Sequence, residues 1–256
     1  MAYFERLDET RFRATEHTAG AWRTDEQHIA PAIGLLAHAV TRDLSARRGN
    51  DLLVGRLAYD ILGVVPVAEV EVSVTVLRPG RTIELVEARL AHAGRDVVVL
   101  RAWLLRPGDT TAIAGTALAP IPTPYAMDPW DPTALWPGGF IRTVEVRRER
   151  DEPGRGRFWV RTETALVDGE DVAPVARAAG LLDIANGMVV RVHPDELHFP
   201  NLDLTAHLVR APEGEWVGFD TTVTFAANGL GLTSTVLHDE QGPLGTLAQV
   251  LTLRPR

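Results

Sequence analysis

The sequence predicts an α+β fold made of two halves, each combining antiparallel strands with one long helix. Three observations lead to this prediction. The chain has 256 residues, of which 45% are hydrophobic and 23% charged, a globular composition with room for one large or two ordinary domains. A proline-rich stretch lies near its middle. On both sides of that stretch, strand and helix patterns follow in the same order.

The stretch at 106–139 separates the two halves. Continuous helix or strand is excluded there by seven prolines, Pro107, Pro120, Pro122, Pro124, Pro129, Pro132 and Pro137. We therefore predict an N-terminal domain over 1–118, a linker over 119–137 and a C-terminal domain over 138–256.

In the first half, residues 24–27 resemble a capping box. The helix predicted after it has apolar residues at helical spacing, namely Ile29, Ile33, Leu36, Val40 and Leu44. Three strands with period-two alternation are predicted next, "EVEVSVTVL" at 69–77, "RTIELVEARLAH" at 81–92 and "DVVVLRAWLL" at 96–105.

In the second half, strands are predicted at "FIRTVEVRRE" and "RFWVRTETAL". A helix is expected to begin at Asp171, to carry Pro174 in its first turn and to end at a left-handed cap at Asn186 and Gly187. Four further strands follow, in "LDLTAHLVR", "EWVGFDTTVTF", "GLTSTVLHD" and "LGTLAQVLTL". The similarity of "IAPAIGLLA" at 29–37 to "VAPVARAAGLLD" at 172–183 favours an internal duplication.

Both predicted helices are too hydrophobic to lie on a surface. A sheet of long, twisted strands has one concave apolar face, which a single central helix can fill. This is the hotdog arrangement. We therefore predict a double hotdog, in which two long central helices are wrapped by one continuous curved antiparallel sheet.

Composition also limits the function. The net charge of −8 argues against nucleic-acid binding, which needs clustered Lys and Arg. The absence of Cys fits a reducing cytoplasm and excludes thiolate chemistry. No signal peptide or membrane span is expected. The eight His residues have no metal-ligand spacing, and phosphate or dinucleotide loops are missing, so we expect neither a metal nor a cofactor.

Asp183 is the strongest candidate for chemistry. It lies in the otherwise apolar run "LLDIANGMVV" at 181–190 and follows Ala179 by four residues, which predicts that it points inward. Burying a carboxylate is costly unless it is partnered. Asp183 is therefore either a structural carboxylate bonded to hydroxyls or amides, or a general base tuned by its burial.

Two further polar positions are candidates. Gln249 shares a strand face with Leu247, Leu251 and Leu253, so it is either a structural amide or a ligand for a carbonyl or a water. In "FPNLDLTAHLVR", alternation predicts one polar face with Asn201, Asp203 and Thr205. That face looks either to solvent or into a site.

The sequence resembles the acyl-CoA thioesterase II (TesB-type) branch of the thioesterase-like superfamily, and within it the actinobacterial group. The resemblance covers almost the whole chain and is carried by segments such as "EQHIAPAIGLLAHAV", "VLRPGRTIELVEA", "LLDIANG" and "FPNLDLTAHLVRAPEGEW". It implies a double hotdog that hydrolyses fatty acyl-CoA to free acid and CoA, with acyl-CoA as its partner.

The resemblance also implies site residues. The family's helix Asp matches Asp183, and its C-terminal Gln matches Gln249. Its Ser or Thr position falls on Asn201 here. Together these residues would bind and activate the attacking water. Where the family has Gly-Gly-Gln, this chain reads Glu26-Gln27-His28-Ile29, so the oxyanion would be held by a non-Gly amide or by the side chains of Gln27 and His28.

Two other functions are compatible with these residues. One is an acyl-CoA or acyl-carrier binding module that has kept the fold without hydrolysis. The other is a hotdog hydratase, which would need an Asp and a His at the start of the active helix, where Val172 and Ala173 follow Asp171. The tandem halves make one chain a pseudo-dimer, and further pairing into a homo-oligomer is compatible with this.

Overall fold

The computed structural model describes residues 1–149 and 152–255. One large curved sheet dominates it, with strands in the order β10-β1-β2-β4-β5-β6-β3-β12-β15-β14-β13-β9-β8-β7. In the first half the strands are β1 (Ala2–Arg6), β2 (Arg11–Ala14), β3 (Leu53–Ile61), β4 (Glu69–Arg78), β5 (Ile83–His92) and β6 (Arg95–Leu105). The second half contributes β7 (Asp128–Trp130), β8 (Val144–Arg148), β9 (Arg155–Thr162), β10 (Ala165–Val167), β12 (Asp203–Leu208), β13 (Val217–Phe225), β14 (Leu230–Asp239) and β15 (Gly242–Thr252).

The two halves repeat one topology. The order β4-β5-β6-β3 in the first half corresponds to β13-β14-β15-β12 in the second. They join where β3 pairs antiparallel with β12, with Tyr59 opposite Leu204. A separate pair is formed by β11 (Leu197–His198) and β16 (Arg254–Pro255). The predicted α+β fold with a continuous curved sheet is confirmed, and the repeated order supports the duplication.

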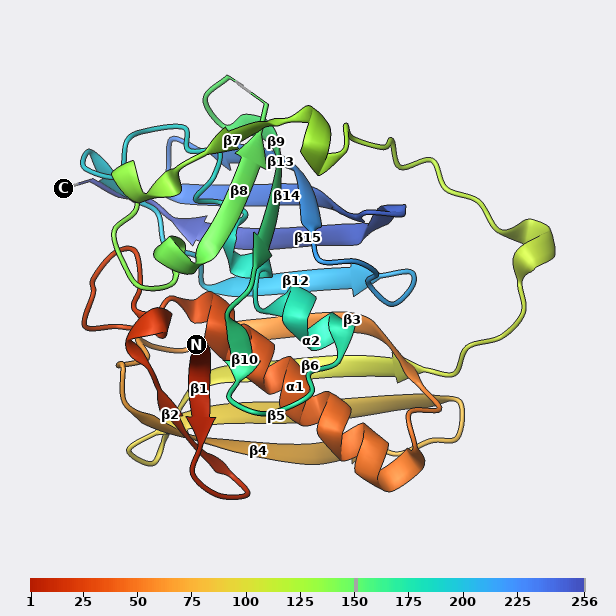
Figure 1. Ribbon diagram of the computed structural model, residues 1–256. Coiled ribbons are helices and arrows are strands. Elements are labelled where there is room, and N and C mark those ends of the chain that lie inside the picture. The colour runs from red at the N-terminus through yellow and green to blue at the C-terminus, as the bar shows by residue number, and fades with distance from the viewer. Residues whose placement is uncertain (150–151, 256) are drawn as a thin grey trace.

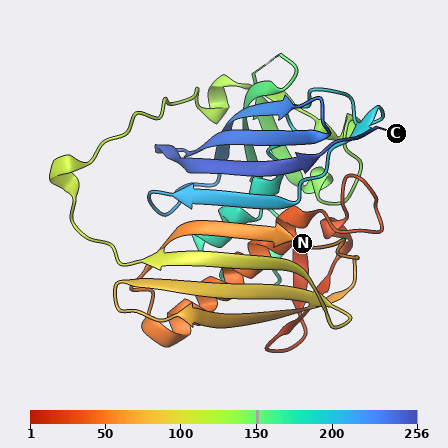
Figure 2. The ribbon, with the colours of Figure 1, turned by 180° about the vertical axis from the view of Figure 1, so that it is seen from behind.

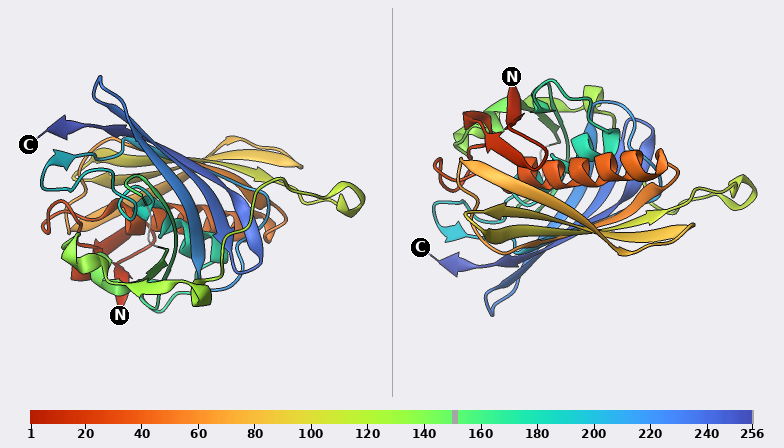
Figure 3. Two further views of the ribbon diagram at one scale, coloured as in Figure 1. Left: turned by 90° about the horizontal axis from the view of Figure 1, so that it is seen from above. Right: turned by 90° about the horizontal axis from the view of Figure 1, so that it is seen from below.

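The first predicted helix is confirmed as α1 (Ile29–Arg48), which lies in the concave face of the sheet (Figures 1 and 3). The predicted capping box is wrong, because the cap is His28, whose Nδ1 accepts from the amide of Ala30. The helix ends at Gly49, whose φ of 64° suits a residue without a side chain. No helix of the described residues covers the opposite face of the sheet (Figure 2).

The prediction of a second long helix is wrong. Only Pro174–Ala179 form α2, and a 3₁₀ turn over Leu182–Ile184 follows. Gly180 separates the two, and a Cβ on Gly34 of α1 would lie 2.8 Å from its Cα. The segment thus breaks where the two helical segments touch. The predicted left-handed cap at Asn186 and Gly187 is also wrong, since neither residue has a positive φ.

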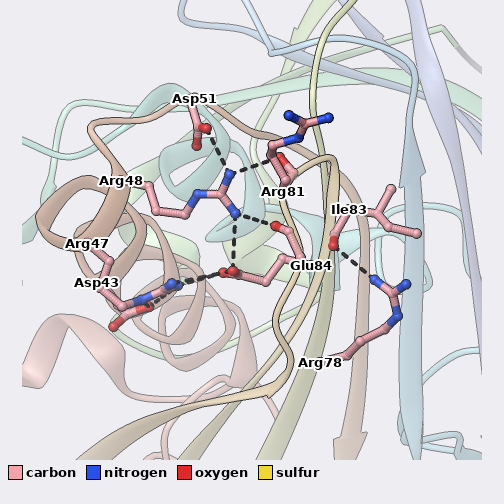
Figure 4. A network of polar contacts seen from close by, with 9 residues as sticks. Asp43, Arg47, Arg48, Asp51, Arg78, Arg81, Ile83 and Glu84 are labelled. Atoms are coloured by element: carbon pink, nitrogen blue, oxygen red, sulfur yellow. Dashed lines mark hydrogen bonds and ion pairs between the residues drawn. The ribbon is translucent and has the colours of Figure 1, made fainter.

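The C-terminal end of α1 is anchored by charge (Figure 4). Glu84 of β5 has a side chain only 2% exposed and accepts from two arginines in the last turn. Arg47 Nη2 lies 2.6 Å from its Oε1 and Arg48 Nη1 lies 3.3 Å from its Oε2. Asp43 and Asp51 complete the network. Cations at this end of a helix also complement its dipole.

The proline-rich connection runs from β6 to β7. Its residues from 106 onward project from the body as a long arm (Figures 1 and 3), with only short 3₁₀ turns at Thr111–Ile113 and Pro124–Ala126 before β7. Beyond β7, Gly138 has a φ of 131° and lies so close to Gly20 that a Cβ on it would lie 2.3 Å from the Gly20 oxygen. The domain limits at 118 and 138 stay a prediction. No described helix is long and apolar enough to cross a membrane.

Candidate active site

A cavity of about 380 Å³ opens at the N-terminal end of α1. Its walls come from both halves of the chain. The first half supplies residues 20–23, the start of α1 and residues 63–65 after β3. The second half supplies residues 183–184, 186–188, 198 and 200–201. Of the predicted site residues, Asp183, Asn201, Gln27 and His28 line this cavity, whereas Gln249 is not among its lining residues.

Asp183 lies in the 3₁₀ turn and is 7% exposed. The inward orientation predicted from the sequence is therefore observed, although on a turn rather than on a long helix. Its Oδ1 accepts from Asn201 Nδ2 at 2.7 Å and from Gln249 Nε2 at 3.2 Å. Burial raises the pKa of Asp183 to about 7, while these two donors act in the opposite direction. Its Oδ2 accepts no hydrogen bond from any described residue.

Asn201 reaches Asp183 because the strand is irregular. Thr205 pairs with Ala248, but Asn201 pairs with Leu251, so the register shifts by one residue. Asp203 fills the irregularity by accepting from the amide of Val250. Such a shift turns side chains to the other face. Asn201 therefore faces the cavity, and the single polar face predicted for Asn201, Asp203 and Thr205 is wrong.

Gln249 lies on β15, and its face was predicted correctly. It is 1% exposed and its neighbours on that face, Leu247 and Leu251, are 2% and 0% exposed. Its amide nitrogen is used by Asp183, whereas its Oε1 is buried without any partner among the described residues. A buried acceptor without a donor is costly, so this oxygen creates a demand for a donor such as water.

His28 faces Asp183 from the first half. Its Nδ1 lies 3.7 Å from Asp183 Oδ2, which is too long for a hydrogen bond. Burial lowers the pKa of His28 to about 3, so the ring is neutral at pH 7 and the contact is not an ion pair. Because Nδ1 accepts from Ala30, the ring proton lies on Nε2. The ring packs against Phe140, with centroids 4.4 Å apart.

Gln27 supports a wall of the cavity. Its side-chain Nε2 donates to the carbonyl of Pro66 at 2.8 Å, and its backbone amide donates to the carbonyl of Val65. The backbone amide of His28 likewise donates to the carbonyl of Thr18. Helix N-termini leave their first amides without intrahelical acceptors. With Ala30 capped by His28 and Pro31 lacking a donor, the amide of Ile29 is the one left over at this end of α1 among the described residues.

Sequence reasoning missed two features of this site. One is the amide of Ile29, which becomes evident only when the partners of its neighbours are known. The other is an aromatic wall in which Trp22 contacts Trp136 and Phe199 edge to face, at centroid distances of 4.9 Å and 5.2 Å. These rings come from three distant segments. The linker sequence "WPGG" was a usable signal, because its glycines allow the close approach that positions Trp136.

Comparison with known families identifies two domains in this chain. The profile of the acyl-CoA thioesterase N-terminal domain matches residues 18–117, and that of the acyl-CoA thioesterase C-terminal domain matches residues 119–253. The fold and these two matches thus define a protein of the thioesterase-like hotdog class. The chain belongs to the acyl-CoA thioesterase family described by these two domains.

Solved structures show the same fold at low identity. A conserved protein of unknown function with a hot dog fold from Alicyclobacillus acidocaldarius superposes with a TM-score of 0.76 at 13% identity, covering 98% of this chain and 96% of the other. Acyl-CoA thioesterase II TesB2 from Mycobacterium marinum gives a TM-score of 0.67 at 16% identity, covering 99% and 96%. Comparison with curated protein sequences finds no match.

Proposed function

We propose that the protein is an acyl-CoA thioesterase that hydrolyses an acyl-CoA to a free acid and CoA by direct attack of water. Asp183 carries this proposal. It is a buried carboxylate beside a cavity, with two amide donors on one oxygen and the other oxygen left for a water. Family membership supports the thioester as the substrate class.

In the proposed reaction, a water held by Asp183 Oδ2 attacks the thioester carbon and Asp183 accepts its proton. With a pKa of about 7, a large fraction of Asp183 is ionised at neutral pH, as a general base requires. Asn201 and Gln249 fix the carboxylate in one orientation. The tetrahedral intermediate then expels the CoA thiolate, which takes the proton from Asp183, and no covalent enzyme intermediate forms.

The developing oxyanion needs donors. We assign this role to the amide of Ile29, because it lies at the N-terminus of a 20-residue helix, where the helix dipole favours negative charge. The Nε2 proton of neutral His28 is the second candidate donor. Gln27 would act indirectly, by holding the residues after β3 in place. No metal or cofactor takes part in this scheme.

The test is Asp183→Asn, which keeps the shape of the side chain and an oxygen that accepts from the side-chain amides of Asn201 and Gln249. We expect the kcat for a saturated acyl-CoA to fall by about a hundredfold or more, as for loss of a general base, with the dissociation constant within threefold of the parent. Asp171→Asn, an exposed carboxylate near the start of α2, is the matched control and should leave both values unchanged. Full turnover by Asp183→Asn would refute the mechanism.

A binding module without hydrolysis is the competing function. It is favoured because the backbone amides of Gln27 and His28 already donate to carbonyls of the protein, which leaves few donors for an oxyanion. Single-turnover assays separate the two functions. Calorimetric binding of an acyl-CoA with no release of CoA from the parent protein would support the module.

A further inference from the structure

The cavity at the proposed active site is short in the direction of the core. Of α1 it touches only the first residue, Ile29, and of β3 only the last, Ile61. The next residues on the same faces are Ile33, one helical turn further on, and Tyr59, two strand residues further back. Neither is among the described residues that line the cavity. The cavity therefore ends between these two layers.

The second layer is closed by the buried ring of Tyr59, which a hydrogen bond holds against α1. The hydroxyl of Tyr59 donates to the carbonyl of Ile33 at 3.1 Å, and this bond links β3 to α1 across the space that a longer ligand would occupy. Tyr59 and Ile33 are 1% and 0% exposed. Leu204 of β12, which pairs with Tyr59, is 0% exposed, and Leu247 of β15 is 2% exposed. The layer is a packed wall of side chains.

The contact of α1 with α2 leaves no passage at Gly34. Gly34, the residue after Ile33, lies against Gly180, so closely that even a Cβ on Gly34 would fall 2.8 Å from the Gly180 Cα and 3.1 Å from Leu166 Cδ1. An alkyl chain cannot pass where a single methyl group does not fit. A ligand that extends inward from the cavity between β3 and α1 therefore meets the ring of Tyr59.

We propose that the buried layer of Tyr59 and Ile33, which lies behind the lining residues Ile29 and Ile61, is the floor that limits the depth of the acyl pocket and restricts the protein to short acyl groups. This inference rests on the proposed function and specifies its substrate class. Each methylene that finds room in an apolar pocket adds about fourfold to affinity for the transition state. Beyond the floor, further methylenes either stay in water or break the buried bond between Tyr59 and Ile33, so the gain stops and reverses.

The experiment measures kcat/KM for acetyl-, butyryl-, hexanoyl-, decanoyl- and palmitoyl-CoA. We expect the parent protein to prefer butyryl or hexanoyl groups, with palmitoyl at least tenfold lower. Tyr59→Ala should move the optimum to longer chains and raise the ratio of decanoyl to butyryl by tenfold or more. Tyr59→Phe, which keeps the ring, should keep the parent optimum. Tyr59→Leu opens less space and serves if Tyr59→Ala does not fold.

Leu90→Ala is the control, because it creates a void in the buried face of β5 away from the cavity and should not move the optimum. The inference is overturned if the parent hydrolyses palmitoyl-CoA as fast as butyryl-CoA, or if folded Tyr59→Ala and Tyr59→Leu keep the parent optimum. S-butyl- and S-hexadecyl-CoA thioethers, measured by calorimetry, separate it from the proposed function. If no thioester is hydrolysed, the proposed function fails, while tighter binding of the butyl compound still supports the floor.

Discussion

Asp183 shows how one buried carboxylate is made usable. Its removal from water raises its pKa, and Asn201 and Gln249 offset part of that cost by donating to a single oxygen. The opposite oxygen accepts no hydrogen bond from a described residue and lies 3.7 Å from His28 Nδ1. Neutral His28 nearby adds no positive charge that would lower the pKa again. The result is a group that titrates near neutral pH, which suits a general base.

Loss of one donor should therefore change the pH profile. The ionised form of Asp183 is the reactive one in the proposed mechanism, so kcat/KM should rise with pH to a plateau, with a midpoint near the pKa of about 7. Asn201→Ala removes a hydrogen bond that stabilises the charged form, so the pKa and the midpoint should rise, by about one pH unit. The measurement is kcat/KM from pH 5 to pH 9. A midpoint that falls or stays fixed in Asn201→Ala would contradict the assigned role of this bond.

The predictable part of the site follows from local pattern. Alternation was enough to predict the buried face of Gln249. Asp183 is buried as predicted, but on a 3₁₀ turn, so the helical spacing behind that prediction does not apply to it. Asn201 was different, since its face depends on a register shift set by Asp203 and Val250. That pairing is a tertiary contact, which no periodicity within the strand encodes.

The helices α1 and α2 show where apolar spacing along the sequence no longer suffices to predict a helix. The run from Ile29 to Arg48 is helical, as its apolar spacing predicts. The run from residue 171 to residue 186 has similar spacing, yet only Pro174–Ala179 are α-helical. Gly180, which weakens a helix, lies at the contact with Gly34. The break depends on this packing between halves, and the same break lets Asp183 leave the helix direction and face the cavity.

The anchor of α1 at Glu84 gives a second test at this scale. Glu84→Gln keeps the size of the side chain but removes the charge that Arg47 and Arg48 share. We expect the free energy of unfolding to fall by about 2 kcal/mol, the usual value for a charged hydrogen-bond partner. Glu5→Gln, whose side chain is 53% exposed beside Arg13, should change it by less than ~0.5 kcal/mol. Urea unfolding followed by circular dichroism measures both, and equal effects of the two variants would argue against the anchor.

At the scale of the whole molecule, the candidate site belongs to neither half alone. His28 and Ile29 come from the first half, whereas Asp183, Asn201 and Gln249 come from the second. The halves are joined by the pairing of β3 with β12, by the contact of α1 with α2, and by β1, which pairs in parallel with β10. The similar sequences of the two halves predicted the repeated strand order. The arm from residue 106 was expected only as a linker, because nothing in a proline-rich sequence fixes its path.

These contacts between the two halves predict that the halves unfold together. Leu237 is fully buried in β14, and Leu237→Ala should lower stability by ~2–5 kcal/mol through loss of packing. If unfolding is cooperative over the whole chain, amides of β5 in the other half should lose as much protection against hydrogen exchange as those of β13. Native-state exchange followed by mass spectrometry measures both sets under one condition. Loss of protection confined to residues 138–256 would mean that the halves are independent domains, and that the site between them can open without unfolding either one.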